Sequence, residues 1–301
     1  MESSICSSKV QPSLRATFIG ASALLIWASA ALCSVELKQV PTFLVVAIVC
    51  AGGFITSSLV NRYSSEYIHP GKIPKQCLAI GFLLLFSTQT GYLAAFKYAP
   101  PAQVDLIYYL WPIMVVAALT LSLKQQNAGR SLLGATLGFI GVFILIYSET
   151  EMKTIQTDYL LGYALALLSA LAWGGYTIYS HCSEQAPMGL MGLCCAPTAL
   201  FAVVLHVIYE PTYIPSLREW MFAALMGVSI LGLSMLLWDH GVKRGHVNLL
   251  TVLSYFNPIL SIGVLVVCGQ ATTSGQLWLG ASFVGLGALV ARPLTVPARK
   301  V

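Results

Sequence analysis

The side chains best suited to chemistry in this sequence lie inside long apolar segments, and most of them are aromatic or uncharged. Gln89, Tyr92 and Phe96 recur at i, i+3 and i+7, so in a helix they share one face. An amide, a phenol and a phenyl ring can hydrogen-bond to a small molecule and stack on it. This face is therefore predicted to form one wall of a binding cavity.

Two later segments carry a similar pattern, each with a proline. Asp105, Tyr109 and Pro112 share a face, and Trp111 lies about 100° from Pro112 on a helix. The second segment has Thr251, Tyr255 and Pro258. A proline inside a membrane helix removes one backbone hydrogen bond, so Pro112 and Pro258 are predicted hinges. The alternative is that they only kink their helices.

Two tryptophans lie deep inside apolar blocks, although this residue usually settles at membrane interfaces. They are Trp27 and Trp173, and Tyr176 follows one turn after Trp173. A chamber lined by such rings would bind a planar or cationic substrate through stacking or cation–π contact. The alternative for each residue alone is ordinary helix packing.

Carboxylates near the apolar blocks are few. Asp105 and Asp239 are the main ones, and His240 stands beside Asp239 as a titratable neighbour. They could bind a substrate ammonium or a coupling proton. Because each carboxylate is near the end of an apolar block, a solvated position at the membrane edge is the favoured interpretation.

Patterns typical of enzymes are missing from the sequence. It contains no nucleophile motif, phosphate loop or paired-histidine pattern, and its 8 cysteines form no C-x-x-C pair. A membrane-embedded enzyme acting on lipid remains an alternative, but no suitable Ser/His or Asp/Asp constellation can be assembled. The net charge of +5 comes from scattered basic residues, so no nucleic-acid partner is predicted. No Cys/His spacing suits zinc, and neither a metal nor another cofactor is predicted.

Composition places these side chains in a bilayer. The 301 residues are 57% hydrophobic and only 9% charged, whereas soluble domains average about 25% charged residues. Apolar blocks of about 18 to 22 residues match the length that crosses a membrane as a helix. The predicted fold is all-α, with ten transmembrane helices at 16–35, 41–60, 77–96, 103–123, 131–148, 159–180, 188–208, 220–238, 247–268 and 275–291.

Basic residues are distributed unequally between the two sides of this topology. Twelve lysines and arginines fall on the side that carries both termini, and four fall on the other side. By the positive-inside rule both termini are cytoplasmic. The predicted location is the inner membrane of a bacterial cell.

The sequence also repeats itself. A shift of 146 residues superposes Trp27 on Trp173, and the same shift pairs Lys97 with Lys243. It further relates Pro41, Tyr109, Pro112 and the run 133–135 to Pro187, Tyr255, Pro258 and 279–281. The predicted repeats are residues 1–150 and 151–301, with five helices each. An odd number of helices inverts the second copy relative to the first.

Inverted repeats are a common architecture of secondary transporters, because two similar halves of opposite orientation can expose a midplane site alternately to either side. The sequence therefore predicts transport of a small molecule by alternating access. Runs of small residues in the fifth and tenth helices, 134–138 and 280–287, predict close packing of these helices with each other or with a second subunit. Both a monomer and a homodimer remain open.

Three short motifs resemble those of a known family. They are YYLWP at 108–112, SYFNP at 254–258 and WDHGVKRGHVN at 238–248. With the two five-helix halves, they resemble the drug/metabolite transporter superfamily, EamA type, and within it the YddG-like exporters of aromatic amino acids and methyl viologen. The resemblance covers nearly the whole chain. It implies export of aromatic amino acids or related aromatic or cationic compounds; a transporter of an unrelated metabolite is the alternative.

The predicted binding chamber combines stackable and hydrogen-bonding side chains from both halves, with little contribution from the fifth and tenth helices. Its members are Trp27, Gln89, Tyr92, Tyr109, Trp111, Trp173, Tyr176, Trp238, Tyr255 and Asn257.

Overall fold

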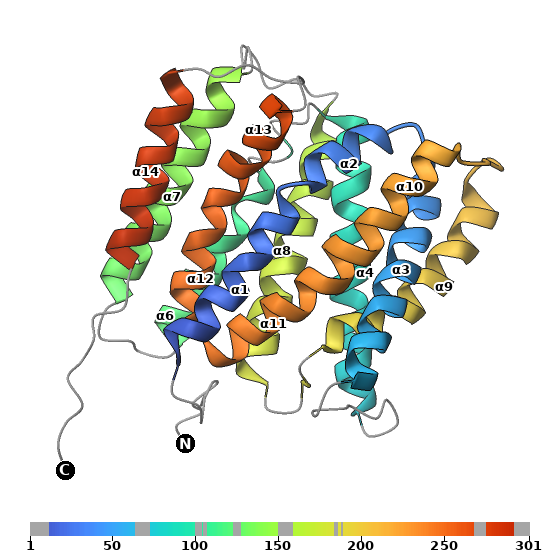
Figure 1. Ribbon diagram of the computed structural model, residues 1–301, viewed down its shortest axis with the longest axis horizontal. Helices are drawn as coiled ribbons and strands as arrows, with labels where there is room; N and C mark the ends of the chain where they lie inside the picture. Colours follow the sequence, from blue (N-terminus) through green and yellow to red (C-terminus); the bar gives the residue numbers. More distant parts are fainter. Residues whose placement is uncertain are drawn as a thin grey trace.

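The computed structural model describes residues 12–63, 73–99, 104, 107–122, 128–149, 159–183, 186–187, 189–267 and 275–291. Within these residues the chain forms helices joined by turns, without a strand (Figure 1). The first half contains α1 (Leu14–Trp27), α2 (Ala30–Glu36), α3 (Thr42–Tyr63), α4 (Lys75–Tyr98), α6 (Trp111–Ser122) and α7 (Ala128–Glu149). The second half contains α8 (Leu160–Cys182), α9 (Leu190–Tyr209), α10 (Leu217–Leu225), the π-helix η3 (Met226–Leu233), α11 (Ser234–Arg244), α12 (Val247–Leu253), the 3₁₀ turn η4 (Ser254–Phe256), α13 (Asn257–Val267) and α14 (Gly275–Ala291).

The helices have the length and surface of membrane spans. Among the described residues, 6 helical segments are long and apolar enough to cross a bilayer: Leu14–Ser34, Thr42–Arg62, Lys75–Tyr98, Leu160–Cys182, Leu190–Tyr209 and Leu217–Arg244. On α9, Leu200 and Val207 are 70% and 75% exposed, although such side chains are usually buried in soluble proteins. The chain is therefore a multi-pass membrane protein.

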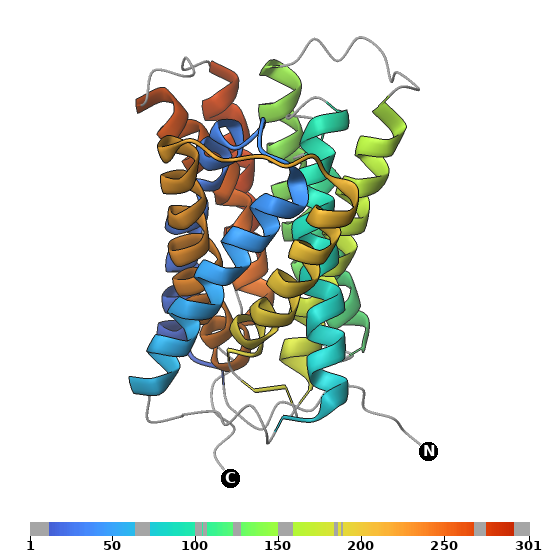
Figure 2. The ribbon, with the colours of Figure 1, turned by 90° about the vertical axis from the view of Figure 1, so that its right-hand side faces the viewer.

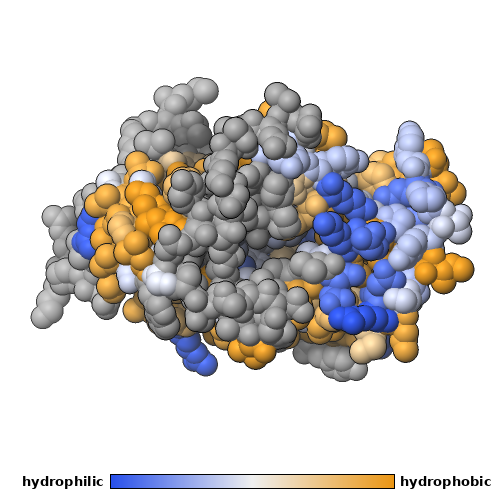
Figure 3. Space-filling model, turned by 90° about the horizontal axis from the view of Figure 1, so that it is seen from above, coloured by the Kyte–Doolittle hydropathy of each residue, from blue (hydrophilic) through white to orange (hydrophobic). Residues whose placement is uncertain are grey.

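Helices α6, α7, α12 with α13, and α14 lie at the positions of the other four predicted spans. The count of ten remains a prediction. Seen from above, hydrophilic side chains gather over part of the upper end, and apolar side chains lie toward its rim (Figure 3).

Long-range packing follows four helix pairs: α3 with α9, α4 with α8, α1 with α11, and α7 with α14 (Figures 1 and 2). Small residues allow the close approach. A Cβ added at Gly20 of α1 would lie 2.7 Å from the Gly241 Cα of α11. The pairing of α7 with α14 agrees with the packing predicted from their small residues, and Gly287 lies directly against Gly134 and Gly138.

Several helices are interrupted. A turn at residues 28–29 separates α1 from α2, and α6 begins at Trp111 directly after a turn. The segment from α10 to α11 passes through η3, and η4 lies between α12 and α13. Interrupted helices are rare in a bilayer unless the irregular backbone is buried in protein or lines a cavity.

Candidate substrate cavity

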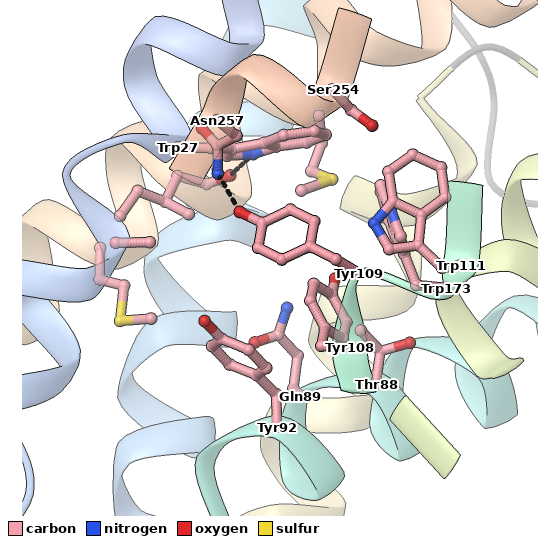
Figure 4. A pocket seen from close by; sticks show the side chains of 14 residues that line it. Trp27, Thr88, Gln89, Tyr92, Tyr108, Tyr109, Trp111, Trp173, Ser254 and Asn257 are labelled. Atoms are coloured by element: carbon pink, nitrogen blue, oxygen red, sulfur yellow. Dashed lines mark hydrogen bonds between the residues drawn. The ribbon is translucent and has the colours of Figure 1, made fainter. Parts of the chain in front are cut away.

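A central cavity of about 100 Å³ is lined in part by residues at these interruptions (Figure 4). Helices from both halves contribute to its wall. The lining residues are Trp27, Ala30, Thr88, Gln89, Tyr92, Tyr108, Tyr109, Trp111, Trp173, Met226, Ile230, Met235, Ser254 and Asn257.

Three indoles line the cavity, and a fourth, Trp238, packs behind them. Trp27 contacts Trp173 edge to face with ring centroids 5.6 Å apart, and lies 4.9 Å from Trp238. Trp111 contacts Trp173 and Trp238 edge to face at 6.1 and 5.7 Å. These separations are typical of favourable aromatic pairs. The indole N–H of Trp27 donates to the Ile230 carbonyl of η3 at 3.3 Å, which orients the ring.

Phenols and amides form part of the rest of the wall. Tyr92 and Tyr108 have ring centroids 4.8 Å apart, and Tyr108 contacts Tyr109 at 6.1 Å. The Nδ2 of Asn257 donates to the Tyr109 hydroxyl at 3.1 Å, which joins the start of α13 to the turn before α6 (Figure 4). Gln89 lies near Tyr92 and Tyr108 (Figure 4).

Two polar atoms in this wall have no hydrogen-bond partner among the described residues: Asn257 Oδ1 and Thr88 Oγ1. A buried polar atom without a partner costs about 1–3 kcal/mol, so a ligand that supplies a donor recovers this free energy. None of the described lining residues carries a formal charge. The cavity therefore suits an aromatic ring together with groups that hydrogen-bond.

The structure brings seven of the ten predicted chamber residues around this one cavity: Trp27, Gln89, Tyr92, Tyr109, Trp111, Trp173 and Asn257. Tyr176, Trp238 and Tyr255 lie behind the wall with no exposed surface. Trp238 is covered by the other three indoles, and the Tyr176 hydroxyl is bonded to Asp239. The Tyr255 ring packs against Gly138 of α7, where a Cβ would clash with it.

Some lining residues were not predicted. Tyr108 and Ser254 belong to the YYLWP and SYFNP motifs, of which only other residues were predicted to line the chamber. Met226, Ile230 and Met235 come from η3 and the first turn of α11. The sequence carries no signal for a π-helix there, and such segments are frequent at functional sites.

The interpretation of Asp239 as a solvated residue was wrong. Asp239 lies inside α11 and is 1% exposed. Its carboxylate accepts from the Tyr176 hydroxyl at 3.0 and 3.1 Å, and from the Gly189 backbone N–H at 3.0 Å. Burial of a carboxylate is tolerated when donors surround it. His240 is half-buried on the same helix, and Asp105 lies outside the described residues.

The two predicted hinge prolines occupy equivalent places. Pro112 is the second residue of α6, and Pro258 is the second residue of α13. In both cases the interruption comes just before the proline. The first turn of a helix has no intrahelical partner for its N–H groups, so proline fits there without breaking a bond.

Comparison with known proteins identifies the family of this chain. The EamA-like transporter family matches residues 14–147 and 160–292, one match in each half. The chain belongs to this family. It is similar to the aromatic amino acid exporter YddG of Ancylobacter novellus, with 31% identity over 92% of this chain and 96% of that protein. It is also 26% identical to the aromatic amino acid exporter YddG of Escherichia coli, over 78% of this chain and 83% of that protein.

One solved crystal structure superposes with a TM-score of 0.84. It is 31% identical in sequence, over 92% of this chain and 98% of that one. As a member of the EamA-like family the chain is a transporter of small molecules, not an enzyme. The family match confirms the resemblance inferred from the three motifs.

Proposed function

We propose that this protein exports aromatic amino acids, or closely related aromatic or cationic compounds, by alternating access. The observation that carries the proposal is the composition of the central cavity, which is lined by indoles, phenols and amides and has no charged residue among those described. A free aromatic amino acid has a ring to stack and a zwitterionic end that needs hydrogen bonds. Both relatives are named as aromatic amino acid exporters, which agrees with this class of substrate.

In the proposed complex the ring of the substrate lies against Trp27, Trp111 and Trp173. Its ammonium group donates to Asn257 Oδ1, an acceptor without a partner among the described residues. The Gln89 amide donates to the carboxylate. Because the zwitterion has no net charge, a cavity without a fixed charge can hold it through hydrogen bonds alone.

The proposed architecture is ten transmembrane helices in two inverted repeats, residues 1–150 and 151–301. Support comes from the packing, because exchange of repeat partners turns the pair α4–α8 into α11–α1 and leaves α3–α9 and α7–α14 unchanged. Further support comes from the interruptions, since Trp111 and Asn257 begin α6 and α13 and are related by the shift that relates Trp27 to Trp173.

The proposal also includes the inner membrane and cytoplasmic termini, for which the bias in basic residues remains the argument. In Figure 1 the start of α1 and the end of α14 lie at the same end of the helices. Within one chain α7 and α14 cover each other, so we propose the monomer as the transporting unit. Pro112 and Pro258 are the proposed hinges, and Asp239 with His240 is the proposed coupling site.

The test is flux from proteoliposomes loaded with labelled amino acids, with and without a proton gradient. Tryptophan and phenylalanine should leave faster than alanine or leucine, which lack an aromatic ring. Protein-free liposomes provide the control for leakage. Equal flux of aromatic and aliphatic amino acids would contradict the proposed substrate class.

A further inference from the structure

Two lysines make the same unusual contact in the two halves. Lys97, in the last turn of α4, donates to the Val40 carbonyl at 2.9 Å. Lys243, in the last turn of α11, donates to the Ala186 carbonyl at 2.5 Å. Each carbonyl belongs to the residue before a proline, Pro41 or Pro187.

The shift that superposes Trp27 on Trp173 also superposes Lys97 on Lys243 and Val40 on Ala186. Both the donor and the acceptor of the contact are therefore related by the repeat. A proline disfavours helical backbone in the residue before it, which leaves this carbonyl outside a helix and open to a side-chain donor. A bond from an ammonium group is about twice as strong as one between neutral groups.

A carboxylate completes each contact by binding the start of the next helix. Near Lys97, Glu210 accepts from the backbone N–H groups of Phe43 and Leu44 at 2.9–3.2 Å. Near Lys243, Asp239 accepts from the N–H of Gly189 at 3.0 Å. Phe43 and Gly189 are again related by the same shift. Glu210 and Asp239 are not related by this shift. The N–H groups at the equivalent helix start are therefore bonded by a carboxylate from a different position in each half.

The contacts lie at opposite ends of the molecule. The turn between α2 and α3, which contains Val40, lies at the top in Figure 1, and the end of α11 lies near the bottom. Lys97 fastens this turn to α4, and Lys243 fastens the turn after α8 to α11, where it also bonds the Ser180 carbonyl at 2.9 Å. The helices next to these contacts carry cavity residues: Ala30 on α2, Gln89 on α4, Trp173 on α8 and Met235 on α11.

We infer that Lys97 and Lys243 are a matched pair of clasps, one for each gate of the central cavity. Opening of the cavity toward the end of the molecule that carries Val40 requires α2 to move away from the end of α4. This movement breaks the bond from Lys97 to the Val40 carbonyl. Opening toward the end that carries Ala186 requires the end of α8 to move away from α11. This movement breaks the bonds from Lys243 to the Ser180 and Ala186 carbonyls. Both lysines are positioning residues, because neither lines the cavity. The inference rests on the proposed transport function and on the repeat.

Native cysteines can report on each end. Cys33 lies in α2. Cys77 lies in the first turn of α4, where the carbonyl of the next residue, Leu78, accepts a bond from Cys194 of α9. Cys33 and Cys77 are 1% and 2% exposed. In a protein that retains one of these cysteines, with the others replaced by alanine, the rate of maleimide labelling in detergent measures the opening of that end.

Lys97→Met should accelerate labelling of Cys33 by about tenfold and leave Cys77 unchanged, because a charged hydrogen bond is lost at one end only. Lys243→Met should do the reverse. Lys97→Arg and Lys243→Arg, which keep a charged donor, should restore most of the protection. Lys75→Met, an exposed lysine on α4, is the matched control and should change neither rate.

Acceleration at both ends in one variant, or at neither end, would overturn the clasps. Where a methionine variant does not fold, the glutamine variant is labelled in its place and the same outcomes apply. Because labelling needs no substrate, this experiment tests the clasps independently of the proposed substrate class. Selective labelling without flux of aromatic amino acids would retain the clasps and reject the substrate class.

Discussion

Trp111 lies in the wall of the cavity and also packs against two other indoles, so its ring joins the proposed site to the core behind it. It is 2% exposed and lies at the first residue of α6. The distinction between binding and packing side chains is clearest among these aromatic residues. Two substitutions separate the roles.

Trp111→Ala should weaken the affinity for an aromatic amino acid several-fold. An aromatic contact contributes about 0.5–1.5 kcal/mol beyond burial, and equilibrium binding of labelled tryptophan measures its loss. Trp220→Ala, at a residue of α10 that is 44% exposed, is the control and should bind normally. Unchanged affinity in a well-folded Trp111→Ala protein would remove Trp111 from the site.

Tyr176→Phe should lower the melting temperature without changing substrate affinity. The hydroxyl donates to the Asp239 carboxylate, and loss of a bond to a charged group costs about 1.5–3 kcal/mol. Tyr209→Phe, at a 73% exposed residue, is the control. Lower affinity at an unchanged melting temperature would instead mean that Tyr176 contacts the substrate, as its position in the sequence indicates.

At the scale of helices, sequence periodicity identified which faces are polar but not how each helix is rotated. Gln89 and Tyr92 were correctly grouped because they share a face of α4. Trp238 and Tyr176 are aromatic in the same way but do not line the cavity. Trp238 packs against Trp27 of α1, and the Tyr176 hydroxyl bonds Asp239. Rotation depends on tertiary contacts, which a single helical segment does not encode.

The close contact of α1 with α11 leads to a prediction about packing. Gly20→Ala should destabilise the protein by about 1–3 kcal/mol, because overpacking costs this much and the new Cβ would meet backbone of α11 at 2.7 Å. Thermal unfolding in detergent measures the effect. Gly129→Ala, whose Cβ would meet nothing within 4 Å, should be neutral. Equal melting temperatures for both variants would contradict the close approach.

At the scale of the whole molecule, composition and the repeat predicted a helical membrane protein and a transporter, and the family match bears out both. The burial of Asp239 was not predicted, because its position near the end of an apolar block suggested water. The donors that make burial possible come from Tyr176 and Gly189. They are distant in sequence and adjacent only in the fold.

Both termini should be cytoplasmic in a bacterial cell. A fluorescent protein fused to the C-terminus should fluoresce, whereas alkaline phosphatase fused there should stay inactive, since it folds only in the periplasm. Fusion of each reporter after residue 150, between the two halves, should give the opposite pattern. The same pattern at both positions would mean parallel halves and would exclude the inverted repeat.

The cavity wall is unequal between the two halves. Under the proposed repeat, Gln89 and Tyr92 on α4 correspond to Met235 and Trp238 on α11. A perfectly symmetric chamber would accept a substrate equally well in two opposite orientations. Here α4 presents hydrogen-bonding side chains where α11 presents a thioether and a buried indole, so we expect a bound amino acid to keep one polarity throughout the transport cycle. Its ring and its zwitterionic end therefore meet the two gates in a fixed order.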